Sequence, residues 1–168
     1  MGVKTHKTHA PANLNTGILS VSTTRSLEND ESGHWIAKQA KKEGHRVSFH
    51  EVVPDDKTII RETALRAIRE HDLEALLITG GTGISMRDVT IEAIQPIFSK
   101  ELTAFAVMFA QLSIDQIDSA AILSRAAAGI IGRTVVFCMP GSKKACKLAC
   151  KAIIFPELGH IAAHIREK

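Results

Sequence analysis

Short apolar runs alternate with longer amphipathic segments along most of the chain, and this alternation predicts strands followed by helices. The segments Ile18–Val21, Ala75–Ile78 and Thr134–Cys138 are rich in apolar and β-branched side chains, which is typical of central strands covered on both faces. Arg46–Val53 alternates polar and apolar residues before ending in two valines, as a partly buried strand does.

The segments between these strands have helical periodicity and recognisable helix starts. Ser32 is the expected N-cap of a helix that reaches about Glu43, and Asp56 is the expected N-cap of the next one. A third helix follows the glycines of the segment 79–88 and begins near Val89.

The last third of the chain is also predicted to be largely helical. Residues 101–128 are expected to form helix with an interruption near Ser113. After the strand at Thr134–Cys138, Ser142 is the expected cap of a final helix that runs through Ile154.

Strands that alternate with helices imply βαβ units, and therefore an α/β fold with a mostly parallel sheet covered by helices on both faces. Ligands of such sheets bind at the carboxyl ends of the strands, where the following loops converge. Three loops are expected at that edge: 22–33, 79–88 and 140–142.

Length and composition agree with one ordinary globular domain. The chain has 168 residues, of which 45% are hydrophobic and 23% charged. Residues 1–13 are basic and aperiodic and are interpreted as a flexible arm, which leaves 14–168 as a single domain. The net charge of +3 is spread without a dense basic block, so a nucleic-acid surface is not expected.

The expected location is the cytoplasm, with no membrane partner. No uninterrupted apolar run reaches the roughly 18 residues of a membrane span, and the first residues lack the apolar stretch of a signal peptide. Cys138, Cys146 and Cys150 form no disulfide framework and are interpreted as small buried hydrophobes, with a metal or redox role as the alternative. The step of four residues from His160 to His164 is interpreted as a solvated helix face.

The segment Thr79–Gly83 is the strongest candidate for chemistry. Gly80, Gly81 and Gly83 carry no Cβ atoms, so their backbone N–H groups can approach an anion closely. The hydroxyls of Thr79 and Thr82 add donors, and a carboxylate at Asp88 suits Mg²⁺ bound together with phosphate oxygens. The alternative is a tight turn in which Asp88 is only a helix N-cap.

The motif in this segment also resembles that of a known protein family. The run from Thr79 to Thr90, followed by Glu92 and Ala93, resembles the signature of the MoaB/MogA proteins of molybdenum cofactor synthesis. The resemblance extends from Leu14 to His160 and is carried by further motifs at Asp30–Gly33, Gly44–His45, Val53–Asp56, Leu123–Arg125, Ala128–Gly129, Met139–Ser142 and Pro156–His160.

The resemblance implies a three-layer α/β/α sandwich that assembles as a homo-oligomer, either a trimer or a hexamer. It also implies a reaction, the Mg²⁺-dependent adenylylation of molybdopterin by ATP. The terminal phosphate of molybdopterin attacks the α-phosphorus of ATP, and pyrophosphate leaves. Chemistry of this kind depends on positioning and charge neutralisation more than on a protein nucleophile.

Site residues carried over with the motifs belong to the same three loops and to two further segments, 53–56 and 123–125. Asp88 and Asp55 are the implied catalytic carboxylates, and Asp88 is the implied metal ligand. Arg125 is either an anion ligand or a structural residue that binds carbonyls. The implied substrate and phosphate site comprises Ser22, Thr23, Ser32, Gly33, Thr79, Gly80, Gly81, Thr82, Gly83, Ser85, Ser124, Arg125, Pro140, Gly141 and Ser142.

One segment departs from the family pattern. Ala104 and Ala106 stand where relatives usually have glycine, Val107 stands for a glutamate and Ala110 for an arginine. Replacement of an ion pair by apolar packing can be neutral for stability. This departure motivates the alternative of a catalytically weak or inactive oligomer that binds molybdopterin or nucleotide. A third reading is an enzyme of this fold that acts on another phosphorylated metabolite.

Overall fold

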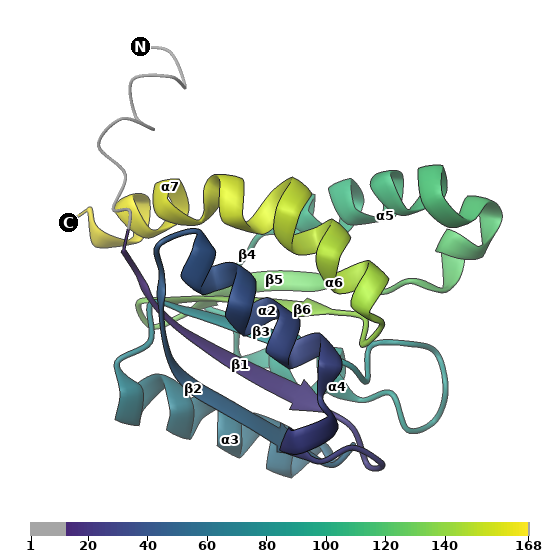
Figure 1. Ribbon diagram of the computed structural model, residues 1–168, viewed down its shortest axis with the longest axis horizontal. Helices are drawn as coiled ribbons and strands as arrows, with labels where there is room; N and C mark the ends of the chain where they lie inside the picture. The colour runs from purple at the N-terminus through teal and green to yellow at the C-terminus, as the bar shows by residue number, and fades with distance from the viewer. Residues whose placement is uncertain (1–12, 168) are drawn as a thin grey trace.

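The computed structural model describes residues 13–167, which form one six-stranded sheet between two layers of helices (Figure 1). Residues 1–12 of the predicted arm lie outside the described residues. The strand order is β2-β1-β3-β6-β5-β4. The strands β1 (Asn15–Val21), β2 (Arg46–Val53), β3 (Ala75–Thr79) and β6 (Thr134–Met139) are parallel, and β5 (Ala127–Ile131) is antiparallel to both β6 and β4 (Lys100–Glu101). The mostly parallel α/β/α architecture is therefore confirmed.

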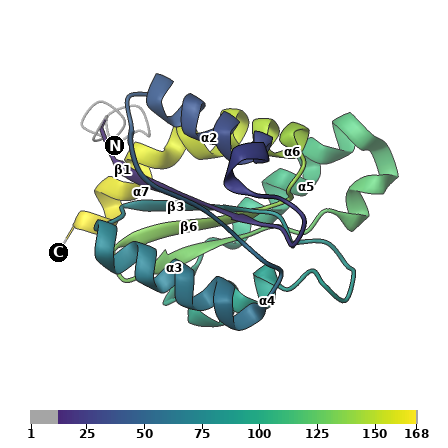
Figure 2. The ribbon, with the colours of Figure 1, turned by 60° about the horizontal axis from the view of Figure 1, so that its bottom comes forward.

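The helices form one layer on each face of the sheet, as Figures 1 and 2 show from two directions. One layer contains α2 (Glu31–Lys42), α5 (Thr103–Ile117), α6 (Lys143–Ala149) and α7 (Phe155–Arg166), and the other contains α3 (Lys57–His71) and α4 (Thr90–Ile94). Short 3₁₀ segments lie at η1 (Leu27–Asn29), η2 (Gln95–Ile97) and η3 (Asp118–Leu123), and a π turn, η4 (Cys150–Ile154), joins α6 to α7.

The apolar runs of the central strands result from burial on both faces. Successive side chains of a strand point to opposite faces, so Ile18 packs in the core with Ile36 of α2. Its neighbour Leu19 packs in the other core with Ile60 of α3. Each of these side chains is fully buried, which explains why a continuous apolar run replaces the alternation of β2.

Two helical segments reach the length and mean hydropathy of a membrane span, although neither is an uninterrupted apolar run. They are Thr103–Leu123 and Lys143–Arg166. The second packs Cys146, Ile154 and Leu158 against the sheet, so its apolar composition supplies the core. The first is interrupted at Asp118 and keeps a largely exposed apolar face.

The predicted N-cap of the first helix is wrong by two residues. Asp30 occupies the cap position of α2, where its Oδ1 accepts a hydrogen bond from the Gly33 N–H at 3.0 Å. The Ser32 hydroxyl instead donates to the carbonyl of Gly141 at 2.9 Å. The caps predicted for the other helices are confirmed, because Asp56 accepts from two backbone N–H groups at the start of α3 and Ser142 accepts from one in α6.

The segment 101–128 differs most from its prediction. α5 is continuous through Ser113, whose hydroxyl donates to the Phe109 carbonyl four residues earlier at 2.7 Å. The helix ends instead at Asp118, which has a positive φ of 52°. β5 was also missed, because its alanines and Gly129 are poor strand formers in isolation. Gly129 is required there, since a Cβ atom would lie 2.3 Å from the Phe98 ring.

The helix predicted to end at Ile154 continues through the π turn to Arg166. All three cysteines are free and buried, as predicted. Burial alone raises the pKa of the Cys138 thiol to about 12, so this sulfur stays protonated. Among residues 13–167 no cysteine joins a group of three side chains suited to a metal ion.

Asp30 has a fully buried carboxylate side chain at the junction of β1, β2 and α2. Its Oδ2 accepts from the Ser20 hydroxyl at 2.5 Å and contacts His50 Nε2 at 2.8 Å. Burial raises the pKa of Asp30, but the hydrogen bonds from His50, Ser20 and the Gly33 N–H outweigh it and lower the pKa to about 2. The carboxylate is therefore held charged in the interior.

This network makes a specific prediction about stability and pH. A folded-state pKa of about 2, against an ordinary value of 3.8, contributes stability above about pH 4 that is lost as the pH falls toward 2. We expect Asp30→Asn to lower the free energy of unfolding at pH 7 by about 2 kcal/mol, since each pKa unit corresponds to roughly 1.4 kcal/mol. The measurement is urea unfolding at several pH values.

The pH profile separates this network from a simple packing defect. The deficit of Asp30→Asn should shrink between about pH 4 and pH 2, whereas Asp72→Asn, an exposed control, should follow the wild type throughout. A deficit of the same size at every pH would contradict the assigned role of the charge.

Candidate functional site

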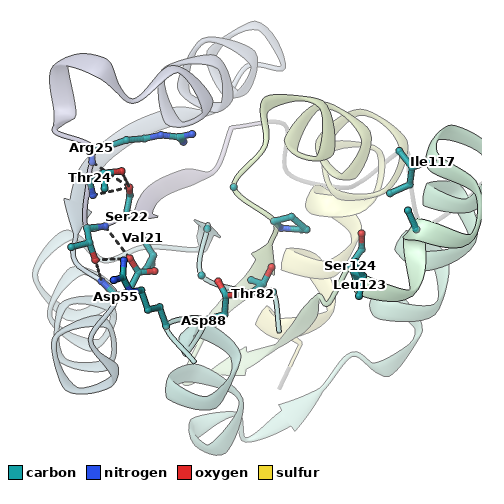
Figure 3. A pocket seen from close by; sticks show the side chains of 18 residues that line it. Val21, Ser22, Thr24, Arg25, Asp55, Thr82, Asp88, Ile117, Leu123 and Ser124 are labelled. Atoms are coloured by element: carbon teal, nitrogen blue, oxygen red, sulfur yellow. Dashed lines mark hydrogen bonds between the residues drawn. The ribbon is translucent and has the colours of Figure 1, made fainter. Parts of the chain in front are cut away.

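A cavity of about 520 Å³ lies at the carboxyl ends of β1, β3 and β6 (Figure 3). β1 leads into α2 on one face of the sheet while its neighbour β3 leads into α4 on the other, and a crevice opens between such strands. The three loops predicted to converge meet there. The lining residues are Val21, Ser22, Thr23, Thr24, Arg25, Asp55, Gly80, Gly81, Thr82, Gly83, Arg87, Asp88, Ile117, Ala120, Leu123, Ser124, Pro140 and Gly141.

Gly80 and Gly81 form the tightest part of the wall. Both have positive φ values, 97° and 62°, which glycine adopts at little cost. A Cβ atom on Gly80 would also lie 2.2 Å from the Val21 carbonyl oxygen. Thr90 fixes the loop from behind, since its hydroxyl donates to the Gly80 carbonyl and its N–H to the Gly81 carbonyl. The backbone therefore reaches the cavity with no side chain in between.

Asp88 lies directly against this loop. Its Oδ2 accepts a hydrogen bond from the Ser85 N–H at 2.8 Å, and a Cβ atom on Gly83 would lie 2.7 Å from the same oxygen. Asp88 is not the N-cap of α4, because that position is held by Val89 without a side-chain hydrogen bond. The carboxylate therefore belongs to the cavity wall, and the helix-cap alternative is wrong.

Asp55 brings a second carboxylate into the cavity from the loop after β2. Its Oδ2 accepts from both the N–H and the hydroxyl of Thr23, at 2.9 and 2.7 Å, which joins this loop to the one after β1. Its Oδ1 lies 3.1 Å from the position that a Cβ atom on Gly81 would take. Figure 3 shows Asp55 toward one end of the cavity and Asp88 near its middle.

These two carboxylates are the candidate ligands for a divalent cation. No group of three His, Cys, Asp or Glu side chains suited to a metal occurs among residues 13–167. Mg²⁺ nevertheless fits this donor set, because it commonly takes one or two carboxylates and fills its other positions with water and phosphate oxygens. The adjacent glycine backbone leaves room for such phosphate groups.

Two arginines of the cavity wall were missed in the sequence. Arg25 lies in the loop after β1, where the Ser22 hydroxyl accepts from its backbone N–H, and Arg87 immediately precedes Asp88. Neither guanidinium forms an ion pair within the part of the chain that the structure describes. Their place in two of the loops predicted to converge was the available signal.

An apolar end of the cavity was also missed. Ile117 at the end of α5 and Ala120 and Leu123 of η3 line it, opposite the end that contains Arg25 (Figure 3). This contribution could not be predicted, because the break in the helix was placed near Ser113. The cavity therefore joins a charged end to an apolar one.

Six of the predicted residues lie behind the wall rather than in it. The Thr79 hydroxyl donates to the Pro140 carbonyl at 3.0 Å, as Ser32 does to Gly141, so both fix the loop that follows β6. The remaining four are Gly33, Ser85, Ser142 and Arg125. The N–H of Gly33 donates to Asp30, that of Ser85 donates to Asp88, and the Ser142 hydroxyl caps α6.

Arg125 is engaged with protein groups. Its two terminal nitrogens bind the Glu92 carboxylate at 2.7 and 3.0 Å, and its Nε donates to the carbonyl of Thr82 at 2.9 Å. The hydrogen bond from Arg125 lowers the pKa of Glu92, so the pair stays charged. Arg125 thus supports the glycine loop from outside the cavity. Of its two predicted roles, anion ligand or structural residue, the structure places it in the structural one.

Comparisons with known proteins identify relatives of this chain. Residues 17–160 match the family described as "Probable molybdopterin binding domain". The molybdenum cofactor biosynthesis protein B of Bacillus cereus is 43% identical over 169 residues, which covers 100% of both chains. That of Bacillus subtilis is 44% identical, with 99% of each chain covered.

Solved structures show the same relationship. The crystal structure of a molybdenum cofactor biosynthesis protein B superposes with a TM-score of 0.91 at 42% identity, over 95% of this chain and 100% of the other. The tungsten cofactor synthesizing protein MoaB from Pyrococcus furiosus superposes with a TM-score of 0.85 at 38% identity, over 94% and 100%. The chain therefore belongs to the MoaB/MogA family of molybdenum cofactor biosynthesis proteins, within its MoaB branch.

Proposed function

We propose that this chain adenylylates molybdopterin with ATP and Mg²⁺ in the cavity between β1, β3 and β6. The observation that supports the proposal is the union of a side-chain-free backbone loop, two carboxylates and two arginines in one cavity. The terminal phosphate oxygen of molybdopterin attacks the α-phosphorus of ATP, a new P–O bond forms, and the bond to pyrophosphate breaks. No protein nucleophile is needed.

Each set of residues that lines the cavity has a role in this reaction. The backbone of Gly80–Gly83 binds phosphate oxygens, since it approaches without Cβ atoms. Asp55 and Asp88 hold Mg²⁺, which when bound neutralises negative charge on the triphosphate. Arg25 and Arg87 add positive charge to the wall of the same cavity. The apolar end at Ile117 and Leu123 leaves space for a planar ring.

The altered segment 104–110 bears on the alternative of a weak or inactive binding protein. Phe105 and Phe109 are buried against the sheet, whereas the side chain of Val107 is 66% exposed on the outer face of α5. No residue from 104 to 110 lines the cavity. The departure therefore lies outside the proposed reaction site of a single subunit, which favours the enzyme.

We also infer a homo-oligomer, a trimer or hexamer, from the same face. α5 and η3 expose a row of apolar side chains, among which Val107 and Ile122 are 66% and 85% exposed. Exposed apolar clusters of this kind are typical of protein interfaces. Because η3 also borders the cavity, a partner subunit on this face would adjoin the proposed reaction site. We expect this assembly to work in the cytoplasm.

The carboxylates can be tested directly. We expect Asp88→Ala and Asp55→Ala each to lower kcat/KM for formation of adenylylated molybdopterin by about 100-fold or more, because positioned charge is lost. The assay follows product and pyrophosphate from molybdopterin, ATP and Mg²⁺. Asp56→Asn is the matched control, since it changes the neighbouring carboxylate, keeps the cap of α3 and should retain activity.

Two results would contradict the proposal. Tight binding of molybdopterin by the wild type with no product would identify a binding protein. Unchanged activity of Asp88→Ala would remove that residue from the metal site.

If this face is the subunit interface, a charge placed on it should lower the mass of the assembly in solution. We expect Val107→Glu and Ile122→Glu to shift the protein toward the 18.2 kDa monomer in light scattering, because a charge would be buried between subunits. Ile59→Glu places the same charge on the exposed face of α3 and should leave the mass unchanged. An unaltered mass in the first two variants would exclude this face as the interface.

A further inference from the structure

The positive charge of the fold is concentrated on α2, α6 and η4, which lie side by side in one helical layer (Figure 1). These elements contain seven lysines and one acidic residue, Glu31, so they carry a net charge of +6 with histidine neutral. The rest of residues 13–167 contains eleven Lys and Arg and seventeen Asp and Glu, a net charge of −6. We call the outer surface of these elements the lysine face. Its exposed lysines are Lys38, Lys41, Lys42, Lys143, Lys144, Lys147 and Lys151.

Little of this charge is neutralised within the fold. Among the described residues, Lys143 is the one lysine of the seven that forms an ion pair, with its Nζ 3.4 Å from Glu31 Oε2. Lys38 and Lys42 are four residues apart on α2, where like charges repel. α6 begins with two lysines and has no acidic residue in its first turn, the reverse of what the helix dipole favours. A negatively charged surface placed against these helices would relieve the repulsion.

Trp35 of α2 joins the two halves of the lysine face. The ammonium groups of Lys147 and Lys151 each lie 5.9 Å from the centroid of its ring, within the range of a cation–π contact. The ring itself packs against the core. These contacts hold the lysines of α6 and η4 close to those of α2, so the charges form one continuous surface.

We propose that the lysine face binds an acidic surface of another protein, whose aspartates and glutamates lie opposite the lysines. The charge of the face is the observation that selects such a partner, because patches of opposite charge speed the encounter of two proteins and fix their orientation. The position of the face adds to its interest. α2 and α6 follow loops that contain Arg25 and Gly141 of the cavity wall, so a bound partner would adjoin the proposed reaction site.

Two other polyanionic partners fit the lysine face less well. Single-stranded nucleic acids stack their bases on open aromatic rings, whereas the Trp35 ring packs on the core and has two ammonium groups over it. Anionic membranes bind basic helices that also insert apolar side chains. The exposed large apolar side chains of residues 13–167 all lie outside α2, α6 and η4. A hydrophilic surface rich in carboxylates is therefore the better complement.

Trp35 supplies the readout for the test, because the chain contains one tryptophan and no tyrosine. The full-length protein is titrated at low ionic strength with a synthetic peptide in which glutamate alternates with serine, and the Trp35 emission is followed. The glutamine counterpart of the peptide is the control ligand. We expect the acidic peptide alone to change the emission, and its binding to weaken as salt screens the exposed charges.

Substitutions test whether the peptide is bound by the lysine face. Lys147→Glu combined with Lys151→Glu should weaken binding by at least about 10-fold, because two attractive charges become repulsive. Lys57→Glu combined with Arg61→Glu makes the same change of charge at the same spacing on α3, in the opposite layer, and should bind as the wild type does. Binding to these variants is measured by the anisotropy of a labelled peptide.

A third variant separates lost charge from lost packing. Lys38→Glu leaves the contacts of Lys147 and Lys151 with Trp35 in place and should also weaken binding. Circular dichroism establishes that each variant is folded before it is titrated. If Lys38→Glu bound the peptide as tightly as the wild type, the proposal would be overturned.

Three further results would overturn it. The first is an emission of Trp35 that the acidic peptide leaves unchanged. The second is tighter binding of oligothymidylate or of phosphatidylserine vesicles than of the peptide, which would make the lysine face a surface for nucleic acid or lipid. The third is a lower mass of the variant with Lys147→Glu and Lys151→Glu in light scattering, because a second copy of this chain would then cover the face.

Discussion

The buried charge of Asp30 determines how the first loop of the site is placed. A carboxylate without water is stable only when donors surround it, and here β1, β2 and α2 each supply one. The chain between Val21 and Asp30 must therefore begin and end at fixed points. Ser22, Thr23 and Arg25 lie on this short connection, so the edge of the cavity is fixed by an interaction that none of its lining residues makes.

Much of the fold could be predicted because its signals are local. The bounds of β2 follow from its alternating pattern, the central strands from their continuous burial, and the caps at Asp56 and Ser142 from side chains that bond within their own turn. The N-cap at Asp30 could not be predicted, because its signal is not local. Its choice over Ser32 depends on Ser20 and His50, which are distant in sequence and meet only in the folded sheet.

The cavity shows the same division between local and long-range information. The glycines and Asp88 could be proposed as a group because they lie in one short stretch of adjacent residues, whereas Asp55 was implied only by the family resemblance. The roles of Arg125 and Ser32 could not be decided, since their partners Glu92 and Gly141 lie 33 and 109 residues away. The apolar end was missed because α5 ends at Asp118, whose positive φ is uncommon for residues other than glycine.

The π turn between α6 and α7 has a consequence for the direction of the whole carboxyl-terminal helix. In an unbroken α-helix, at 100° per residue, Leu158 and Ala162 would point about 120° and 160° away from Cys146. All three are nevertheless buried against one sheet, because the extra residue of the turn rotates the later segment back by about 100°. Deleting one residue from Cys150–Ile154 would leave a regular helix in which Leu158 and Ala162 still point about 20° and 60° from Cys146. The π turn thus accommodates one extra residue without changing which side of α7 lies against the sheet.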